Sequence, residues 1–163
     1  MKKTYHNMAH LGKIMEVSMK ETVENLLYWR KAVLKQWLDG DTAKVIIDLG
    51  FNRINAEMTI RMAGIDTPEI HSDNSVERKL ASKALKICED QIPVNSTFLL
   101  KTQKPYPTDK YGRWIGHFFL LNNMALTLNV LLLDAHLALP YNGGKKNSQL
   151  VELLLPYNQD VLQ

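Results

Sequence analysis

The sequence contains little cysteine and no long apolar run, and both absences limit what it forms. Its 163 residues include a single cysteine, Cys88, which excludes an internal disulfide and a cysteine-based zinc site. No stretch reaches the roughly 18 consecutive apolar residues that a transmembrane helix needs. The most apolar run, residues 124–139, is interrupted by polar side chains. We therefore expect no membrane span.

An excess of one charge sign is also missing. The chain has 20 basic and 17 acidic residues, a net charge of +3, which permits an anionic partner without requiring one. Apolar residues make up 45% and charged residues 23%, as in folded globular proteins. We predict one domain over residues 31–163, expect a monomer, and assign residues 1–30 to an N-terminal extension that apolar spacing favours as helical over 13–28.

A secretory leader is not recognised at the N-terminus. Lys2 and Lys3 resemble the start of one, but an apolar segment of roughly 7–15 residues should follow. His6, His10 and Lys13 interrupt that segment. We therefore expect an intracellular, cytoplasmic location.

Apolar periodicity predicts three strands, a helix, two strands and further helices. Strands are predicted over 33–37, 44–49, 55–63, 97–101 and 114–121. Helices are predicted over 75–90, capped by Asn74 or Ser75, over 124–134, and from a Ser148 cap to about residue 156. Five strands with a helix between the third and fourth indicate an α+β fold class, a small five-stranded barrel of the OB type. Alternating βαβ units are not seen, which argues against a parallel doubly wound sheet.

Three short polar stretches stand where predicted strands begin or end. They are residues 39–42 (DGDT), residues 66–69 (DTPE) with Arg61 just upstream, and residues 109–113 (DKYGR). The first stretch is also a favoured hairpin turn, and the third is also consistent with a solvated loop. In the third stretch, cations alternate with aromatic rings, a composition that suits a phosphate backbone and stackable bases.

Together these residue types suggest hydrolysis of a phosphodiester. Carboxylates and carbonyl oxygens, such as those of Asp41, Asp66 and Thr67, are the ligands that calcium and magnesium take. Two arginines, Arg61 and Arg113, can each bind two phosphate oxygens, where charge builds in the transition state. Glu69 remains to orient or deprotonate the attacking water.

The three stretches, in this order, make the sequence resemble the staphylococcal nuclease (thermonuclease) family over roughly Ala32 to Tyr141. The resemblance implies an OB-fold barrel with three helices. It also implies a calcium-dependent enzyme that cuts DNA and RNA at the 5′ P–O bond and leaves 3′-phosphate ends. Magnesium is the alternative ion, since the sequence does not distinguish the two.

Carried over by position, the resemblance makes Arg61, Glu69 and Arg113 the catalytic residues. It makes Asp41, Asp66 and the carbonyl of Thr67 the metal ligands, and it places Lys110, Tyr111 and Tyr141 beside the nucleotide. Two alternatives stay open. One is an OB-fold module that holds single strands or a protein without cutting, and the other is a phosphodiesterase for small nucleotides.

Overall fold

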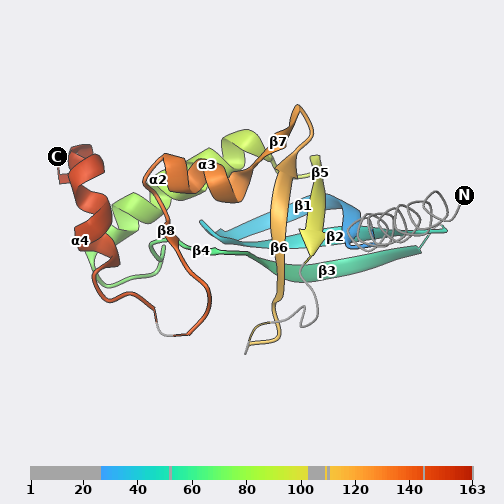
Figure 1. Ribbon diagram of the computed structural model, residues 1–163, viewed down its shortest axis with the longest axis horizontal. Coiled ribbons are helices and arrows are strands. Elements are labelled where there is room, and N and C mark those ends of the chain that lie inside the picture. The colour runs from blue at the N-terminus through green and yellow to red at the C-terminus, as the bar shows by residue number, and fades with distance from the viewer. Residues whose placement is uncertain (1–26, 52, 103–108, 110, 145, 163) are drawn as a thin grey trace, which may run out of the picture.

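The computed structural model describes residues 27–51, 53–102, 109, 111–144 and 146–162. Most of the predicted N-terminal extension lies outside these residues, and its last two, Trp29 and Arg30, open the first strand. Figure 1 shows strands that cross one another beside a group of helices.

A six-stranded sheet forms the centre of the fold. Its strands are β1 (Trp29–Asp39), β2 (Thr42–Gly50), β3 (Arg53–Met62), β5 (Thr97–Thr102), β6 (Trp114–Leu120) and β7 (Asn123–Thr127). They follow the order β3-β2-β1-β5-β6-β7 with antiparallel neighbours, and β3 also pairs with β6 in parallel. Along this path each of the first five strands has a neighbour on both sides. The result is a mixed α+β fold consistent with the predicted OB arrangement, although the sheet has a sixth strand, β7, beyond the five that were predicted.

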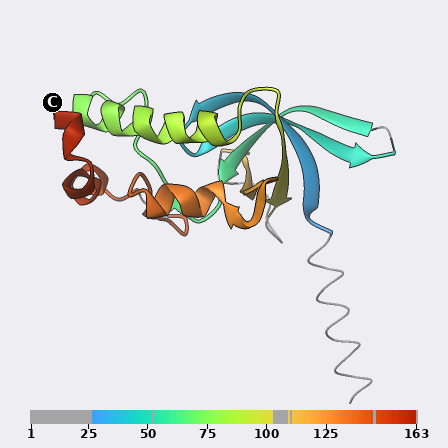
Figure 2. The same cartoon turned by 90° about the horizontal axis from the view of Figure 1, so that it is seen from above.

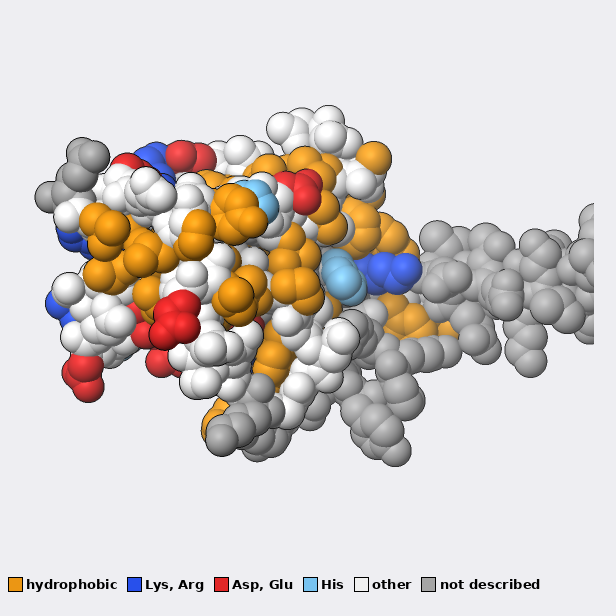
Figure 3. Space-filling model, turned by 60° about the vertical axis from the view of Figure 1, so that its left-hand side comes forward, with side chains coloured by type: hydrophobic (Ala, Val, Ile, Leu, Met, Phe, Trp, Pro, Cys, Tyr) orange, Lys and Arg blue, Asp and Glu red, His pale blue; other side chains and the backbone are white. Residues whose placement is uncertain are grey.

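The described residues form three α-helices. These are α2 (Ser75–Gln91), α3 (Leu128–Asp134) and α4 (Leu150–Leu154), which continues into short 3-10 turns. Asn74 caps α2 as predicted, because its side chain accepts hydrogen bonds from the amides of Val76 and Glu77. The helices gather at one end of the molecule, and the β2–β3 hairpin projects from the other (Figure 2). Figure 3 shows apolar side chains spread among charged ones on the face where that helical end comes forward.

Two helix predictions were wrong in part. Residues 123–127 form β7, because they continue from β6 and pair with it, and α3 begins only after Thr127. The hydroxyl of Thr127 accepts the amide of Val130 and so caps the shortened helix. Ser148 is not the cap of α4, whose first residue follows Gln149 without a side-chain cap.

The core lies between the sheet and α2. The rings of Phe98 and Phe118 stack with centroids 4.9 Å apart, and Trp37 lies 5.7 Å from Phe118. Cys88 is fully buried on the inner face of α2, as the helical spacing predicted. This packing fixes the strand ends from which the polar stretches emerge.

Candidate active site

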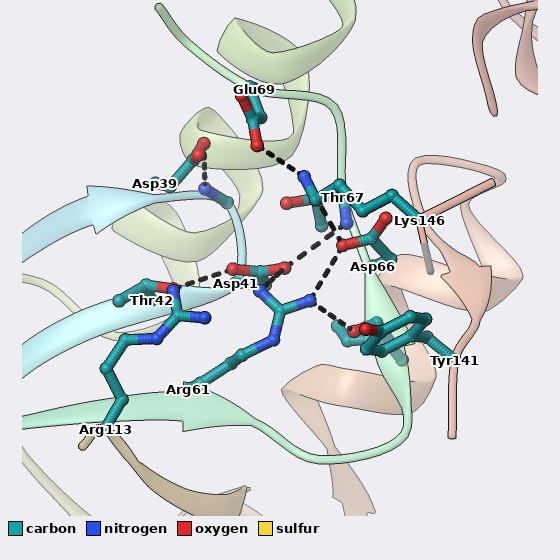
Figure 4. Close-up of polar contacts among 12 residues, drawn as sticks. Asp39, Asp41, Thr42, Arg61, Asp66, Thr67, Glu69, Arg113, Tyr141 and Lys146 are labelled. Atoms are coloured by element: carbon teal, nitrogen blue, oxygen red, sulfur yellow. Dashed lines mark hydrogen bonds and ion pairs between the residues drawn. The ribbon is translucent and has the colours of Figure 1, made fainter. Parts of the chain in front are cut away.

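Arg61 joins two buried carboxylates at the end of β3. Its two terminal nitrogens donate to Asp41 Oδ2 at 2.6 Å and to Asp66 Oδ1 at 2.7 Å. The three residues are 8%, 3% and 2% exposed, respectively, so water screens the cluster little. Burial alone would lower the pKa of Arg61, but the two carboxylates outweigh it and the pKa is raised. The structure therefore brings together three of the predicted residues, with Arg61 between the two acids (Figure 4).

The turn between β1 and β2 places Asp41 against β3. The amide of Met62 donates to the carbonyl of Asp41 at 2.7 Å. Gly40 lets the turn lie against Thr67 and helix α2, since an added Cβ would lie 3.0 Å from Thr67 Oγ1 and 3.1 Å from the Cβ of Ala84. The DGDT stretch is thus a turn, as its alternative interpretation held, and also part of the site.

Arg113 enters the same site from the start of β6. In the parallel pairing, Arg61 lies opposite Ile115, which brings the two arginines to neighbouring strands. Asp109 holds the guanidinium of Arg113 through Nε at 2.8 Å and a terminal nitrogen at 2.6 Å. Buried Asn129 bridges the two strands, because it donates to the carbonyl of Ala63 and accepts the amide of Phe118.

Glu69 follows the short strand β4 (Ile65–Asp66) and meets a lysine that no motif predicted. Lys146 Nζ lies 2.5 Å from Glu69 Oε1 and 3.6 Å from Asp66 Oδ1. The hydrogen bond and charge of Lys146 lower the pKa of Glu69, so its carboxylate form is favoured.

A second short strand brings this lysine into reach. β8 (Leu139–Pro140) pairs with β4, and the amide of Tyr141 donates to the carbonyl of Gly64. The guanidinium of Arg61 lies 5.5 Å from the centre of the Tyr141 ring. The β4–β8 pair therefore places Tyr141, and the loop that follows it, over the acidic cluster.

A fourth carboxylate, Asp39, lies at the end of β1 beside the others. Its Oδ1 accepts the amide of Gly40 at 2.8 Å. Burial, opposed by that hydrogen bond and helped by the charge of Asp41, raises the pKa of Asp39 to about 6. Sequence reasoning included Asp39 in the DGDT stretch but gave the residue no role of its own in the site.

These side chains line one open pocket of about 1260 Å³. Six of the predicted site residues line it: Asp41, Arg61, Glu69, Tyr111, Arg113 and Tyr141. Asp39 and Thr42, which belong to the DGDT stretch, also line it, as does Lys146, and none of these three was predicted as a site residue. Asp66 and Thr67 are buried directly behind Arg61 and Asp41, and Lys110 falls outside the described residues.

The donor atoms are chemically suited to a hard cation. Among the described residues, no three histidine, cysteine or acidic side chains are grouped as a ready metal site. Two buried oxygens, Asp66 Oδ2 and Thr67 Oγ1, have no hydrogen-bond partner in the part of the chain that the structure covers. Buried polar atoms ordinarily have partners, and an all-oxygen set is what calcium and magnesium take. The residues therefore fit such an ion.

No helix within the described residues is long and apolar enough to cross a membrane.

Comparison with known proteins gives a family and one relative. The model of the family described as "Staphylococcal nuclease homologue" matches residues 59–159, a range that includes Arg61, Glu69, Arg113 and Lys146. Over 105 residues, the chain is 33% identical to "Uncharacterized lipoprotein MG186" of Mycoplasma genitalium. The match covers 61% of this chain and 39% of that protein, so this chain spans well under half of its relative's length.

Proposed function

This chain belongs to the Staphylococcal nuclease homologue family, and we propose that it is a metal-dependent nuclease that hydrolyses phosphodiester bonds in DNA and RNA. The observation that carries the proposal is the convergence on one pocket of Arg61, Arg113 and Glu69 around Asp41. Two guanidinium groups, a carboxylate that faces solvent and a buried acidic pair are the parts that this hydrolysis needs.

We propose calcium as the ion, held by Asp41, Asp66 and the carbonyl of Thr67, with magnesium as the alternative. The buried Asp66 Oδ2, which has no hydrogen-bond partner among the described residues, supports this assignment. When bound, the ion would offset negative charge on the phosphate oxygens. In that state Asp41 and Asp66 would share their charge between the ion and the guanidinium of Arg61.

The two arginines bind and orient the phosphate. Charge on its equatorial oxygens increases in the transition state, so fixed guanidinium groups stabilise that state more than the bound substrate. Asp109 fixes the orientation of Arg113, and the acidic pair fixes that of Arg61. Because both arginines are held before substrate arrives, little reorganisation is needed during the reaction.

Glu69 orients the attacking water and accepts its proton. Water attacks phosphorus and the 5′ P–O bond breaks. The products are a 3′-phosphate end and a 5′-hydroxyl end, whose oxygen takes up a proton from solvent. Lys146 lowers the pKa of Glu69 and so keeps it in the carboxylate form, the only form that can accept a proton.

Tyr141, Tyr111 and Lys110 are proposed to contact the nucleotide. Tyr141 and Tyr111 line the pocket, and aromatic rings stack on bases that are not paired. We therefore expect the enzyme to prefer nucleic acids whose strands separate readily. We also propose that it acts as a monomer with an OB-type barrel.

The predicted intracellular location also stays a proposal, and fractionation of cells that produce the protein would test it.

A digestion assay tests the proposed function. Plasmid DNA, single-stranded DNA and RNA are incubated with the protein in calcium, magnesium or EDTA, and the ends are analysed. We expect cleavage in calcium, loss of cleavage in EDTA and 3′-phosphate ends. Binding of the same strands without cleavage in either ion would instead support the non-catalytic binding module. Cleavage of a dinucleotide analogue but not of long strands would support the small-nucleotide phosphodiesterase.

A further inference from the structure

Lys146 places a positive charge among the acids of the pocket. The residue comes from the loop between β8 and α4, and its Nζ bridges Glu69 Oε1 at 2.5 Å and Asp66 Oδ1 at 3.6 Å (Figure 4). One of these carboxylates is a proposed metal ligand, and the other is the proposed acceptor of the water's proton. A single ammonium group thus contacts both functions of the site.

The ammonium is held by charge. Burial would lower the pKa of Lys146, but the hydrogen bond to Glu69 and the charge of Asp66 raise it. The Lys146 side chain is 48% exposed, and that of Glu69 is 53% exposed. The pair with Glu69, accessible to water on both sides, is therefore weak, and the contact with buried Asp66 is long at 3.6 Å, so another cation can exchange with the lysine.

The surrounding loop leaves room for Lys146 to withdraw. Gly143 and Gly144 precede it with φ angles of +89° and +97°. No atom lies within 4 Å of where their Cβ atoms would be, and the carbonyl of Gly144 accepts a hydrogen bond from the Tyr141 hydroxyl at 2.8 Å. Lys146 and both glycines line the open pocket, and the side chain can move towards its mouth.

We propose that Lys146 is an internal counter-ion of the acidic site that competes with the divalent metal. Because the inference rests on the proposed function, it applies to the metal assigned there. When the ion binds, repulsion between like charges drives the ammonium away from Asp66. Withdrawal also removes the lysine from Glu69 Oε1, which is then open to the proton of the attacking water. Metal binding and release of the proton acceptor are thereby coupled.

Calcium binding by the whole chain, measured by isothermal titration calorimetry with calcium chloride alone, tests the competition. Lys146→Met should bind calcium at least about fivefold more tightly than the wild type, because it removes a like charge close to the ion. Lys146→Arg keeps the charge and should retain the wild-type affinity. Lys86→Met removes an equal charge from the exposed face of α2 and should also leave the affinity unchanged.

The same samples are assayed for DNA cleavage in calcium, which separates failure of this inference from failure of the proposed function. Equal or weaker calcium binding by Lys146→Met, in a protein whose wild type cleaves DNA, overturns the competition and leaves the nuclease intact. A wild type that neither binds calcium nor cleaves DNA contradicts the nuclease. If Lys146→Met then also fails to bind calcium, the competition is overturned as well. Unfolding midpoints without metal confirm that each variant is folded.

Discussion

The two ends of the β2–β3 hairpin both depart from the usual pattern of buried apolar and exposed charged residues. One end buries a charged side chain, and the other exposes an aromatic one. At one end Thr42 pairs with Arg61, and that arginine is 8% exposed. At the other end Gly50 pairs with Arg53, and between them Phe51 is 100% exposed. Figure 2 shows that this second end extends away from the helices. The same two strands therefore bury charge and expose an aromatic ring.

The difference shows that the covering elements decide burial along this hairpin. Asp66 of β4 and the ring of Tyr141, which follows β8, cover the end that carries Arg61, and nothing in the described residues covers Phe51. Burying a charge costs free energy unless it is paired and hydrogen-bonded, so the arginine requires both of its acids. A buried charge cluster of this kind departs from the ordinary pattern of an apolar core, and such departures are expected at functional sites.

Removal of Arg61 should have the largest effect. Arg61→Met leaves Asp41 and Asp66 as buried charges without their main partner, which should cost roughly 3–5 kcal/mol of unfolding free energy. Urea denaturation in EDTA measures this cost, and DNA cleavage should be lost as well. The exposed pair of Lys86 and Asp90 offers the control, since Lys86→Met should cost no more than about 1 kcal/mol. An Arg61→Met protein as stable as this control would show that the cluster is not held by charge pairing.

The sequence predicts those elements of the fold that neighbouring residues determine, and it fails where contacts between distant segments decide. Strands β1 to β3 and helix α2 follow from alternation, helical spacing and the Asn74 cap, and all four are confirmed. The helix predicted from residue 124 was wrong in its first turn, because pairing with β6 outweighs local helical propensity there.

The site residues also fall into those that local sequence predicts and those that distant contacts place. Arg61, Asp41 and Asp66 belong to recognisable stretches, and they meet as the stretches implied. Lys146 was not predicted because its position depends on the pairing of two-residue strands far apart in the chain. Asp39 was recognised as part of the DGDT stretch but received no role of its own, because a turn accounts for an Asp-Gly pair. Its environment depends on burial, which the local sequence does not reveal.

Arg113→Lys should sharpen the contrast between catalysis and stability. Lysine cannot bind two phosphate oxygens in one plane, so kcat should fall roughly 10²–10³-fold. The ion pair with Asp109 is partly exposed, so the free energy of unfolding should change little. Steady-state kinetics on single-stranded DNA measure kcat and KM separately. A rise in KM with unchanged kcat would make Arg113 a tether for substrate and not a group that stabilises the transition state.

Asp39→Asn should make the protein less sensitive to pH. The folded protein holds the Asp39 proton up to a pKa of about 6, whereas the unfolded chain releases it near the ordinary value of 3.8. The folded state therefore binds more protons between these values, and wild-type stability falls as pH rises from about 4 to 6. The side-chain oxygen of asparagine can still accept the hydrogen bond from the Gly40 amide, and asparagine carries no charge. The variant should equal the wild type at low pH and exceed its stability above pH 6.

Urea denaturation of both proteins at several pH values, in EDTA, measures this difference. Asp134→Asn, on the exposed end of α3, serves as the matched control. A stability difference between Asp39→Asn and the wild type that stays constant across the pH range would show that Asp39 ionises alike in the folded and unfolded chain.

Phe51→Asn, at the exposed end of the hairpin, should have the smallest effect. The ring has no burial to lose, and asparagine tolerates the positive φ of 50° at this residue. The unfolding free energy should stay within about 0.5 kcal/mol of the wild type, with cleavage unchanged. Ile60→Ala, fully buried on the same hairpin, should instead cost roughly 2–5 kcal/mol. A large loss from Phe51→Asn would reveal that the hairpin end is covered in solution.

Turnover of Glu69→Gln on single-stranded DNA in saturating calcium tests the central claim most directly. The variant keeps the size of the side chain and removes its ability to accept a proton. If Glu69 acts on the attacking water beside the two arginines, kcat should fall roughly 10²–10⁴-fold while the unfolding midpoint in EDTA stays near that of the wild type. A rate close to that of the wild type would contradict the assignment of this pocket as the place where the phosphodiester is hydrolysed.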